Sequence, residues 1–424
     1  MTAGPAFSQP MIAQIRAACP ELTNYALIVD PFEHGDLLTA IAAVLDQASP
    51  DFAAKAQAQL DLVPADQMAG AKKLFAQANG FSMPLNLKPG ELLPVNVLQP
   101  IQLVNDAFQA SQFRTQRVTW HGDLGTDRDD AEIAEQAGRF MRQAAWHEAG
   151  HAVAYGRGYL RSLSLADLAN STKGPLTPTT DWQQTARRNM SEQLADGFSL
   201  RMVAMANRDE ALTMAQELVD FRSVSIISSL MRGHPDHIHH FADPAINAAV
   251  AGMASGLMVG AEASDAAEAT WKTYQAAPTT ADDMTELGSL AQKLRTPTEF
   301  GDQAILFALA EAGRTAETKP TYLVTRNYAD AMRRLLPADH PQWVPFGQVQ
   351  EAIARHPKAA LWDQQTPLVG ARILATRVAM TRGNTVTPKP DLQPHTQPHK
   401  PPGAQSQVQP RAQPQGSTPP RVQM

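Results

Sequence analysis

The stretch that decides the fold covers residues 129–156 and reads DDAEIAEQAGRFMRQAAWHEAGHAVAYG. Its acidic beginning favours a helix, because carboxylates interact well with the positive end of the helix dipole. From Phe140 onward, apolar and histidine side chains recur at spacings of three or four, as on one face of a helix. Gly156 and Gly158 are suited to ending it. We therefore predict one long helix that begins near Asp127 and carries HEAGH at 147–151.

The HEAGH motif combines residue types that suit metal-assisted hydrolysis. His147 and His151 are four residues apart, so on a helix both imidazoles point the same way and can bind one tetrahedral zinc ion. Glu148 would lie beside the open coordination position, where it can take a proton from water and pass it to a leaving amine. The small residues at 149, 150 and 152 leave room for a metal. The alternative is an ordinary amphipathic helix with two surface histidines.

A third zinc ligand is expected on another helix, and residues 190–202, MSEQLADGFSLRM, offer one. Glu192 and Asp196 are four residues apart and share a helical face. Glu192 could bind the metal while Asp196 accepts a hydrogen bond from a ligand histidine and fixes its tautomer. The alternative is a solvated acidic face. Cys19 is the single cysteine, so neither an intrachain disulfide nor a cysteine-rich metal site can form, and the ligands must be His, Asp or Glu.

Together, HEAGH and Glu192-x-x-x-Asp196 resemble the gluzincin metallopeptidases over residues 140–202. The resemblance implies a zincin-like fold and a Zn²⁺ ion held by His147, His151 and Glu192. It also implies that Glu148 is the general base and that Asp196 supports a ligand histidine. The expected substrate is a protein or peptide.

Residues 146–153, WHEAGHAV, are also similar to the peptidase helix of the membrane-anchored AAA proteases. In that family the third ligand is an aspartate after a helix of small residues, and residues 251–270, AGMASGLMVGAEASDAAEAT, place Asp265 there. The chain contains no P-loop GxxxxGK[ST], so the predicted peptidase is independent of ATP. Ser255-Gly256 also replaces the acidic pair of that family's helix. Glu192 is the favoured third ligand and Asp265 the alternative.

Histidines gather at residues 233–240, GHPDHIHH. One of them, with His237 as the candidate, could donate a hydrogen bond to the oxyanion of a tetrahedral intermediate. The cluster could also bind a second metal. The alternative is a polar loop between helices that includes His234, His239 and His240.

Composition bounds the partners and the location. The formal net charge of -6 argues against a general nucleic-acid-binding protein, which would need a basic face. The N-terminus lacks the pattern of a secretory signal, and the most apolar stretch, 246–261, is shorter than a membrane-spanning helix requires. We therefore expect no integral membrane segment and a protein that is cytoplasmic or exported by a leaderless route.

The expected fold is mainly α, with a zincin-like core that includes a small β element. The predicted divisions are a helical N-terminal region (1–104), the catalytic domain (105–275), a helical C-terminal region (276–384) and a disordered Pro/Gln-rich tail (385–424). The expected strands are 117–120 and 159–168, and 84–100 is expected to be an extended connector. The other predicted helices are 36–47, 66–79, 187–206, 210–232, 244–274, 300–312, 327–336, 347–355 and 368–382.

The predicted function is ATP-independent hydrolysis of peptide bonds. The alternative is a non-enzymatic interaction or effector protein that binds partners through its tail and has a structural or degenerate zinc site. An open water position on the metal would favour catalysis, whereas a fourth protein ligand would favour the structural role.

Overall fold

The computed structural model describes most of the chain outside several connecting segments. Contacts divide the chain into two units, Met1–Gly383 and Asn384–Met424, and every described residue belongs to the first. The predicted helices 36–47 and 66–79, the predicted strand 117–120 and the predicted tail 385–424 lie almost entirely outside the described residues. The described residues are 4–19, 22, 26–29, 50–61, 65, 69, 80–88, 91–98, 130–160, 182–233, 235–254, 262–295, 302–336 and 338–383.

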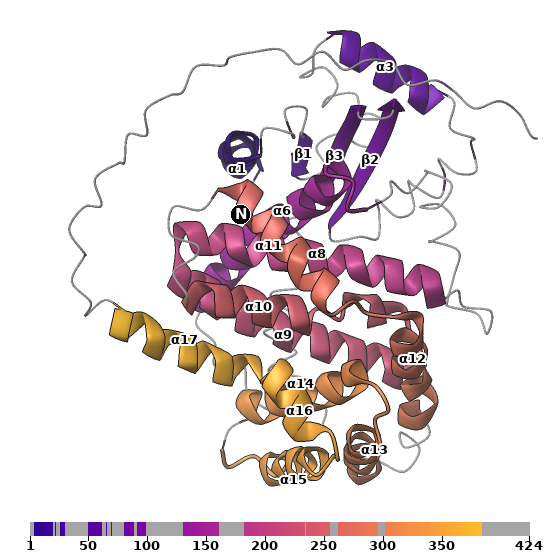
Figure 1. Ribbon diagram of the computed structural model, residues 1–424, viewed down its shortest axis with the longest axis vertical. Coiled ribbons are helices and arrows are strands. Elements are labelled where there is room, and N and C mark those ends of the chain that lie inside the picture. Colours follow the sequence, from indigo (N-terminus) through magenta and orange to yellow (C-terminus); the bar gives the residue numbers. More distant parts are fainter. Residues whose placement is uncertain are drawn as a thin grey trace, which may run out of the picture. The chain divides into compact units, whose positions relative to one another are not determined.

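A small sheet forms near the N-terminus, beside helices α1 (Gly4–Ala18) and α3 (Pro50–Asp61). Its strands are β1 (Ala26–Val29), β2 (Gly80–Lys88) and β3 (Glu91–Leu98). Strand β3 lies in the middle, antiparallel to β2 and parallel to β1, as Figure 1 shows.

Most of residues 84–100 belong to the β2–β3 hairpin, so the prediction that this stretch is extended is confirmed, but its prediction as a connector is wrong. Pro84 lies opposite Pro94, so two residues that lack a backbone N–H face each other across the strands. The prolines therefore did not prevent regular pairing. The β element of the described fold is found here; of the predicted strand 159–168, only Tyr159 and Leu160 are described, and they form a bend.

The predicted central helix is confirmed as α6 (Asp130–Gly156). It packs against α8 (Trp182–Ala206), which in turn packs against α9 (Arg208–Met231) and the short 3-10 helix η3 (Pro235–His240). Strands β2 and β3 also lie beside α6. The predictions of helices at 187–206 and 210–232 are confirmed, although α8 begins five residues earlier than expected.

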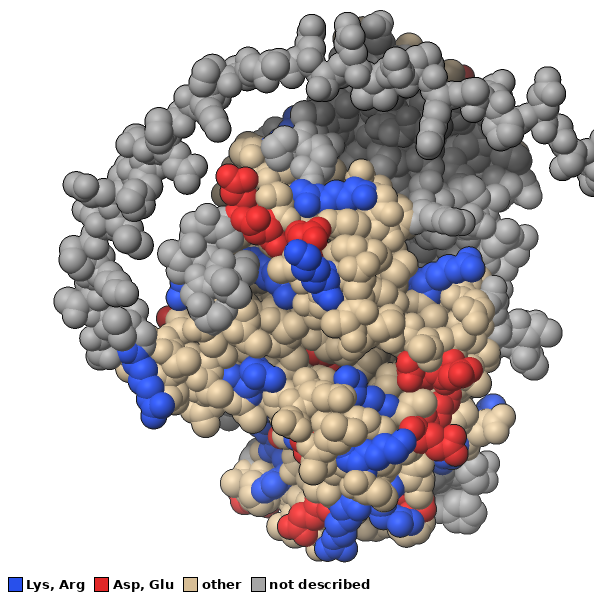
Figure 2. All heavy atoms as spheres, viewed as in Figure 1, with Lys and Arg blue, Asp and Glu red and all other residues tan. Residues whose placement is uncertain are grey.

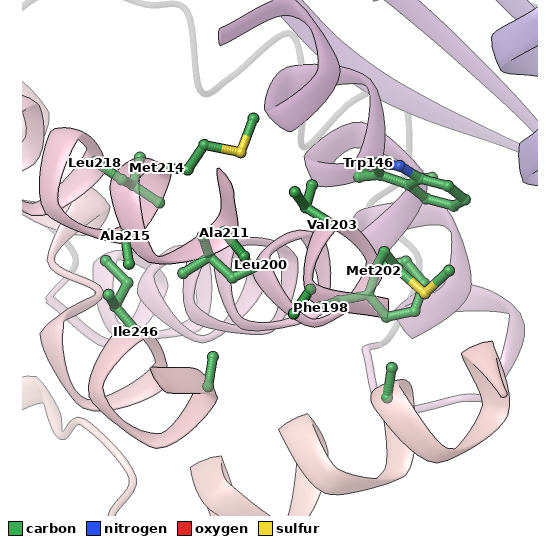
Figure 3. Packing of buried hydrophobic residues seen from close by; sticks show 14 of the residues in the cluster. Trp146, Phe198, Leu200, Met202, Val203, Ala211, Met214, Ala215, Leu218 and Ile246 are labelled. Carbon is green, nitrogen blue, oxygen red and sulfur yellow. The ribbon is translucent and has the colours of Figure 1, made fainter. Parts of the chain in front are cut away.

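One hydrophobic core joins these central helices. Trp146 of α6 meets Phe198 of α8 edge to face, with 6.3 Å between ring centroids. Leu200 and Val203 of α8 and Leu218 of α9 are buried in the same cluster, which Figure 3 shows in close-up. This packing fixes the relative positions of the helices that carry the predicted ligands.

Residues 244–274 do not form the single helix that was predicted. The structure has α10 (Asp243–Ala254) and, after a gap in the described residues, α11 (Ala263–Ala276). The backbone N–H of Glu262 donates to Oδ2 of Asp265 (3.0 Å), which is a capping interaction and starts α11 afresh. The apolar periodicity continued across this break and did not reveal it.

Most of the remaining described helices enclose a second core that also includes residues from α8 and α9, whereas Val369 and Ile373 of the last helix belong to the first core. This core therefore spans residue 276, where a domain boundary was predicted. The mainly helical fold is confirmed, and α12 and α16 are helices that the sequence did not predict. These elements are α12 (Ala281–Arg295), α13 (Asp302–Arg314), α14 (Lys319–Leu335), α15 (Trp343–Ala354), α16 (Ala359–Gln365) and α17 (Val369–Gly383).

On the face drawn in Figure 2, acidic and basic side chains of the described residues lie near one another rather than in one large patch. Within the described part of the chain, none of the helices combines the length and apolar character needed to cross a bilayer.

Candidate metal centre

A close contact between α6 and α8 positions the site. A Cβ atom added to Gly150 would lie 2.9 Å from Cα and 3.2 Å from the carbonyl oxygen of Ala195, so only a glycine fits there without displacement. Ala149 and Ala195 have no exposed surface. Small residues thus let the two backbones approach closely, which brings the histidine face of α6 against the acidic face of α8.

Two imidazole nitrogens and the two oxygens of one carboxylate meet across this contact. His147 Nε2 lies 3.1 Å from His151 Nε2. Glu192 Oε2 lies 3.4 Å from His147 Nε2, and Glu192 Oε1 lies 3.7 Å from His151 Nε2. The two histidines are buried and Glu192 is largely buried. Together these residues form a group that could hold a metal ion.

The spacing of these ligand atoms is compatible with coordination of a single metal ion. Zinc bonds to His nitrogen and carboxylate oxygen are about 2.0–2.2 Å long, so the ligands of a tetrahedral ion are roughly 3.3 Å apart. The observed separations of 3.1, 3.4 and 3.7 Å bracket this value. The two nitrogens and the Glu192 carboxylate could therefore serve together as ligands of one ion, with the nitrogen-to-oxygen distances measured to Oε2 from His147 and to Oε1 from His151.

His147 is oriented by a buried carboxylate. Its Nδ1 lies 2.7 Å from Oδ1 of Asp196, a residue with no exposed surface. When the Nδ1–H group of His147 donates to Asp196, Nε2 of the same ring faces His151 and Glu192. Burial lowers the pKa of His147, but the charges of Asp196 and Glu192 outweigh it and raise this pKa to about 10.

Asp196 is held in turn by a hydrogen-bond network. Arg222 of α9 donates from Nη2 to Oδ1 (3.1 Å) and from Nε to Oδ2 (3.2 Å), and Gln143 Nε2 donates to Oδ1 (3.3 Å). Burial raises the pKa of Asp196, yet Arg222 and then His147 outweigh burial and lower it. Asp196 is therefore an ionised acceptor in a fixed position.

His151 is oriented by a hydroxyl group. Its Nδ1 lies 2.8 Å from Oγ of Ser191, the residue that precedes the candidate ligand Glu192. The hydroxyl can accept the Nδ1 proton, which again leaves Nε2 for the metal. Burial, followed by the positive charge of His147, lowers the pKa of His151 to about 4. This imidazole is thus neutral, the state that a metal requires.

Glu148 is buried, and in the sequence it lies between His147 and His151. Its Oε2 has no hydrogen-bond partner within the part of the chain that the structure describes. Burial raises the pKa of Glu148 to about 8, and the charge of His147 opposes this rise. A buried polar oxygen without a partner is costly, and a water molecule or a bound ligand could satisfy it.

Glu192 has two further neighbours on the side of α9 and η3. His240 Nδ1 lies 2.9 Å and Arg222 Nη2 lies 3.4 Å from Glu192 Oε2. Burial raises the pKa of Glu192, but His240 and His147 outweigh it and hold this pKa well below its usual value. The candidate ligand is therefore a carboxylate anion in the folded protein.

The residues proposed from the sequence fall into two groups. His147, Glu148, His151, Glu192 and Asp196 come together as described above. Asp265 instead lies at the exposed first turn of α11, where its carboxylate accepts the hydrogen bond that begins the helix.

Of the clustered histidines, His240 contacts the candidate ligand Glu192. The ring of His237 is stacked near that of His240, with 5.8 Å between centroids, and His237 is not in either potential metal-binding group of the described residues. His239 contributes to the second of these groups. Burial, and then the charge of His240, lower the pKa of His239 well below its usual value. His234 lies outside the described residues.

Sequence reasoning missed several residues of the centre. Gln143 lies one helical turn before His147, so the spacing of four could have indicated it. Ser191 adjoins Glu192 and carried no signal of its own. Arg222 lies 30 residues beyond Glu192 on another helix, and no local pattern connects the two. Its place depends on the packing of α8 against α9.

Comparisons with protein-family models, with curated proteins and with solved structures each gave no match for this chain.

Proposed function

We propose that this chain is a zinc-dependent peptidase whose centre is formed by His147, His151 and Glu192. The observation that carries the proposal is the meeting of two imidazole nitrogens with one carboxylate. The Nε2 atoms of His147 and His151 are 3.1 Å apart, and they lie 3.4 and 3.7 Å from Oε2 and Oε1 of Glu192, spacings that suit three protein ligands around one tetrahedral zinc ion. Two nitrogens and one carboxylate oxygen are also the donor types that zinc accepts in hydrolytic enzymes. Zinc, when bound, would act as a Lewis acid toward a peptide carbonyl group and water.

Within this proposal Glu148 moves the proton. Its carboxylate is buried beside the ligands and has an oxygen without a partner among the described residues. It would take a proton from the attacking water and deliver it to the leaving nitrogen. Asp196 and Ser191 would keep both imidazoles in the tautomer that binds metal through Nε2.

The histidine cluster would supply a donor to the oxyanion that develops on the substrate. The sequence suggested His237, whereas His240 is the member that contacts Glu192. Both are candidates, because their rings are stacked with 5.8 Å between centroids. A donor placed near the developing charge stabilises the transition state more than the ground state.

A structural zinc site is the second candidate function. It is favoured by the 2.9 Å contact between His240 Nδ1 and Glu192 Oε2, which brings a fourth potential ligand near the triad. Four protein ligands would close the coordination sphere and exclude water. In that case Glu148 would have no role in catalysis, and its replacement would change no rate.

The test compares the zinc-loaded full-length chain with its Glu148→Gln variant on a peptide library, with new termini identified by mass spectrometry. The variant should retain zinc and lose hydrolysis by about two or more orders of magnitude. Glu217→Gln is the matched control, because Glu217 is also a buried glutamate but pairs with Arg139 (2.7 Å) away from the ligands. Equal rates in the wild type and Glu148→Gln, or a zinc-loaded wild type that cleaves nothing, would contradict the proposal.

A further inference from the structure

A second set of donor atoms adjoins the first and shares one residue with it. One ligand atom from each of Glu192, His239 and His240 lies within 4.8 Å of the others. This set is formed by α8 and η3, whereas the first is formed by α6 and α8. The shared Glu192 has two oxygens, so it could bind one cation on each side.

The histidines of this second set are held in a defined place. Asn189 of α8, which has no exposed surface, donates from Nδ2 to the carbonyl oxygens of His239 (2.9 Å) and Phe241 (2.6 Å). Ile238 and Phe241, on either side of the histidine pair, are buried in the second core. The 3-10 helix is therefore anchored to α8, and its histidines are positioned by more than loop packing.

A positive group already occupies part of this space. Arg222 Nη1 lies 2.7 Å from His240 Nδ1, and Arg222 Nη2 lies 3.4 Å from Glu192 Oε2. The arginine side chain is only 11% exposed. A guanidinium has donors but no acceptor, so it can approach Nδ1 at this distance only if that nitrogen presents its lone pair. A lone pair beside a carboxylate is also what a metal cation would use.

His240 Nδ1 cannot serve both of its neighbours at once. It lies 2.9 Å from Glu192 Oε2, to which it could only donate, and it could only accept from Arg222. When Arg222 is the partner, the nitrogen and the carboxylate oxygen together face one cation. The lone-pair atoms around Arg222, His240 Nδ1 and Glu192 Oε2, therefore resemble a cation site that is filled by the arginine side chain.

We propose that Glu192, His239 and His240 form a second divalent-metal site, and that Arg222 is the built-in cation that competes with the metal for it. The inference rests on the proposed function only in that the first ion is taken to lie at His147 and His151. The wild-type chain then holds one zinc tightly and a second weakly. Loss of the guanidinium removes the repulsion between it and the second ion and frees the lone pair of His240.

The experiment is a zinc titration of the full-length chain by equilibrium dialysis with metal analysis, using zinc alone as the probe. Arg222→Gln should bind the second equivalent roughly tenfold or more tightly than wild type, because two positive charges no longer compete at contact distance. Arg222→Lys, which keeps the charge, should leave the second equivalent weak. The double variant Arg222→Gln with His239→Ala should return to one equivalent.

Titration of the wild-type chain tests the proposal even if Arg222→Gln does not fold. In wild type the weak second equivalent should be present at high zinc concentration and absent from His239→Ala, whose first equivalent should be unchanged. A second equivalent that is missing from wild type, that persists in His239→Ala or that is not tightened in a folded Arg222→Gln would overturn the proposal. Failure of the peptidase proposal would appear separately, as unchanged hydrolysis in Glu148→Gln.

Discussion

Nδ1 of His147 lies 2.7 Å from Oδ1 of Asp196, and this contact joins the motif of α6 to the acidic face of α8 in the interior of the protein. The Asp196 carboxylate has no exposed surface and also accepts hydrogen bonds from Arg222 and Gln143. A histidine held in this way has its free nitrogen directed before any metal arrives. Much of the site's geometry is thus built by residues that would not touch the metal.

Replacement of Asp196 should weaken zinc binding without removing a ligand. Asp196→Ala eliminates the acceptor of the Nδ1 proton, so the ring of His147 loses its fixed orientation, and we expect a roughly 10–100-fold weaker affinity for zinc. The affinity can be measured by competition with a chromophoric chelator. Asp265→Ala is the control and should bind like wild type. An unchanged affinity in a folded Asp196→Ala would show that the contact does not support the metal.

The identity of the third ligand can be decided with two variants. Glu192→Ala removes the carboxylate that faces His147 and His151 and should abolish stoichiometric zinc binding. Asp265→Ala should retain zinc and slightly lower the free energy of unfolding, because the capping box at the start of α11 loses the carboxylate that accepts from the backbone N–H of Glu262. Zinc content and thermal unfolding are measured on the same samples. Loss of zinc from Asp265→Ala alone would reverse the assignment.

The helix contact at Gly150 should be sensitive to a single methyl group. Gly150→Ala forces a Cβ against the backbone of Ala195, and we expect a loss of about 1–3 kcal/mol in stability together with weaker zinc binding. Gly138→Ala is the matched control on the same helix. The nearest atom to its added Cβ is 3.6 Å away, so it should be neutral or stabilising by up to about 1 kcal/mol. Similar behaviour of the two variants would rule out the close approach of α6 and α8.

Zinc uptake should release a proton from His147. The pKa of this residue is raised to about 10, so the metal-free imidazole is protonated at neutral pH and zinc must displace the proton on Nε2. The apparent affinity therefore rises with pH until about pH 10. Between about pH 8, above which Glu148 is mostly ionised, and about pH 10, below which His147 still holds its proton, calorimetry in buffers of different ionisation enthalpy should give close to one proton per zinc. No release there would contradict the assigned state of His147.

The sequence predicted the parts of the site that depend on helical periodicity. The spacing of four places His147 beside His151 and Glu192 beside Asp196, because each pair lies on one helix. It could not show that His240 rather than His237 reaches Glu192, since the irregular turn of η3 decides which ring faces inward. Arg222 was invisible for a related reason, because helix packing rather than local sequence places it.

The fold, like the site, was predictable from the sequence only where local periodicity determines it. The long helix α6 was predictable from its acidic beginning and its terminal glycines, whereas the break between α10 and α11 was not. Small apolar residues continue in the sequence across that break, and α11 begins at a capping box formed by Glu262 and Asp265. The strands β2 and β3 were missed because their prolines, Pro84 and Pro94, suggested a connector. These prolines lie opposite one another in the register, and the strands pair on both sides of them.

The most direct test of the central claim is the anomalous diffraction of crystals of the full-length chain loaded with one equivalent of zinc, recorded at the zinc absorption edge. The account predicts one strong peak about 2.0–2.2 Å from His147 Nε2, His151 Nε2 and a carboxylate oxygen of Glu192. A peak at Asp265, a peak bound by His239 and His240 without the α6 histidines, or no peak in the protein would contradict it.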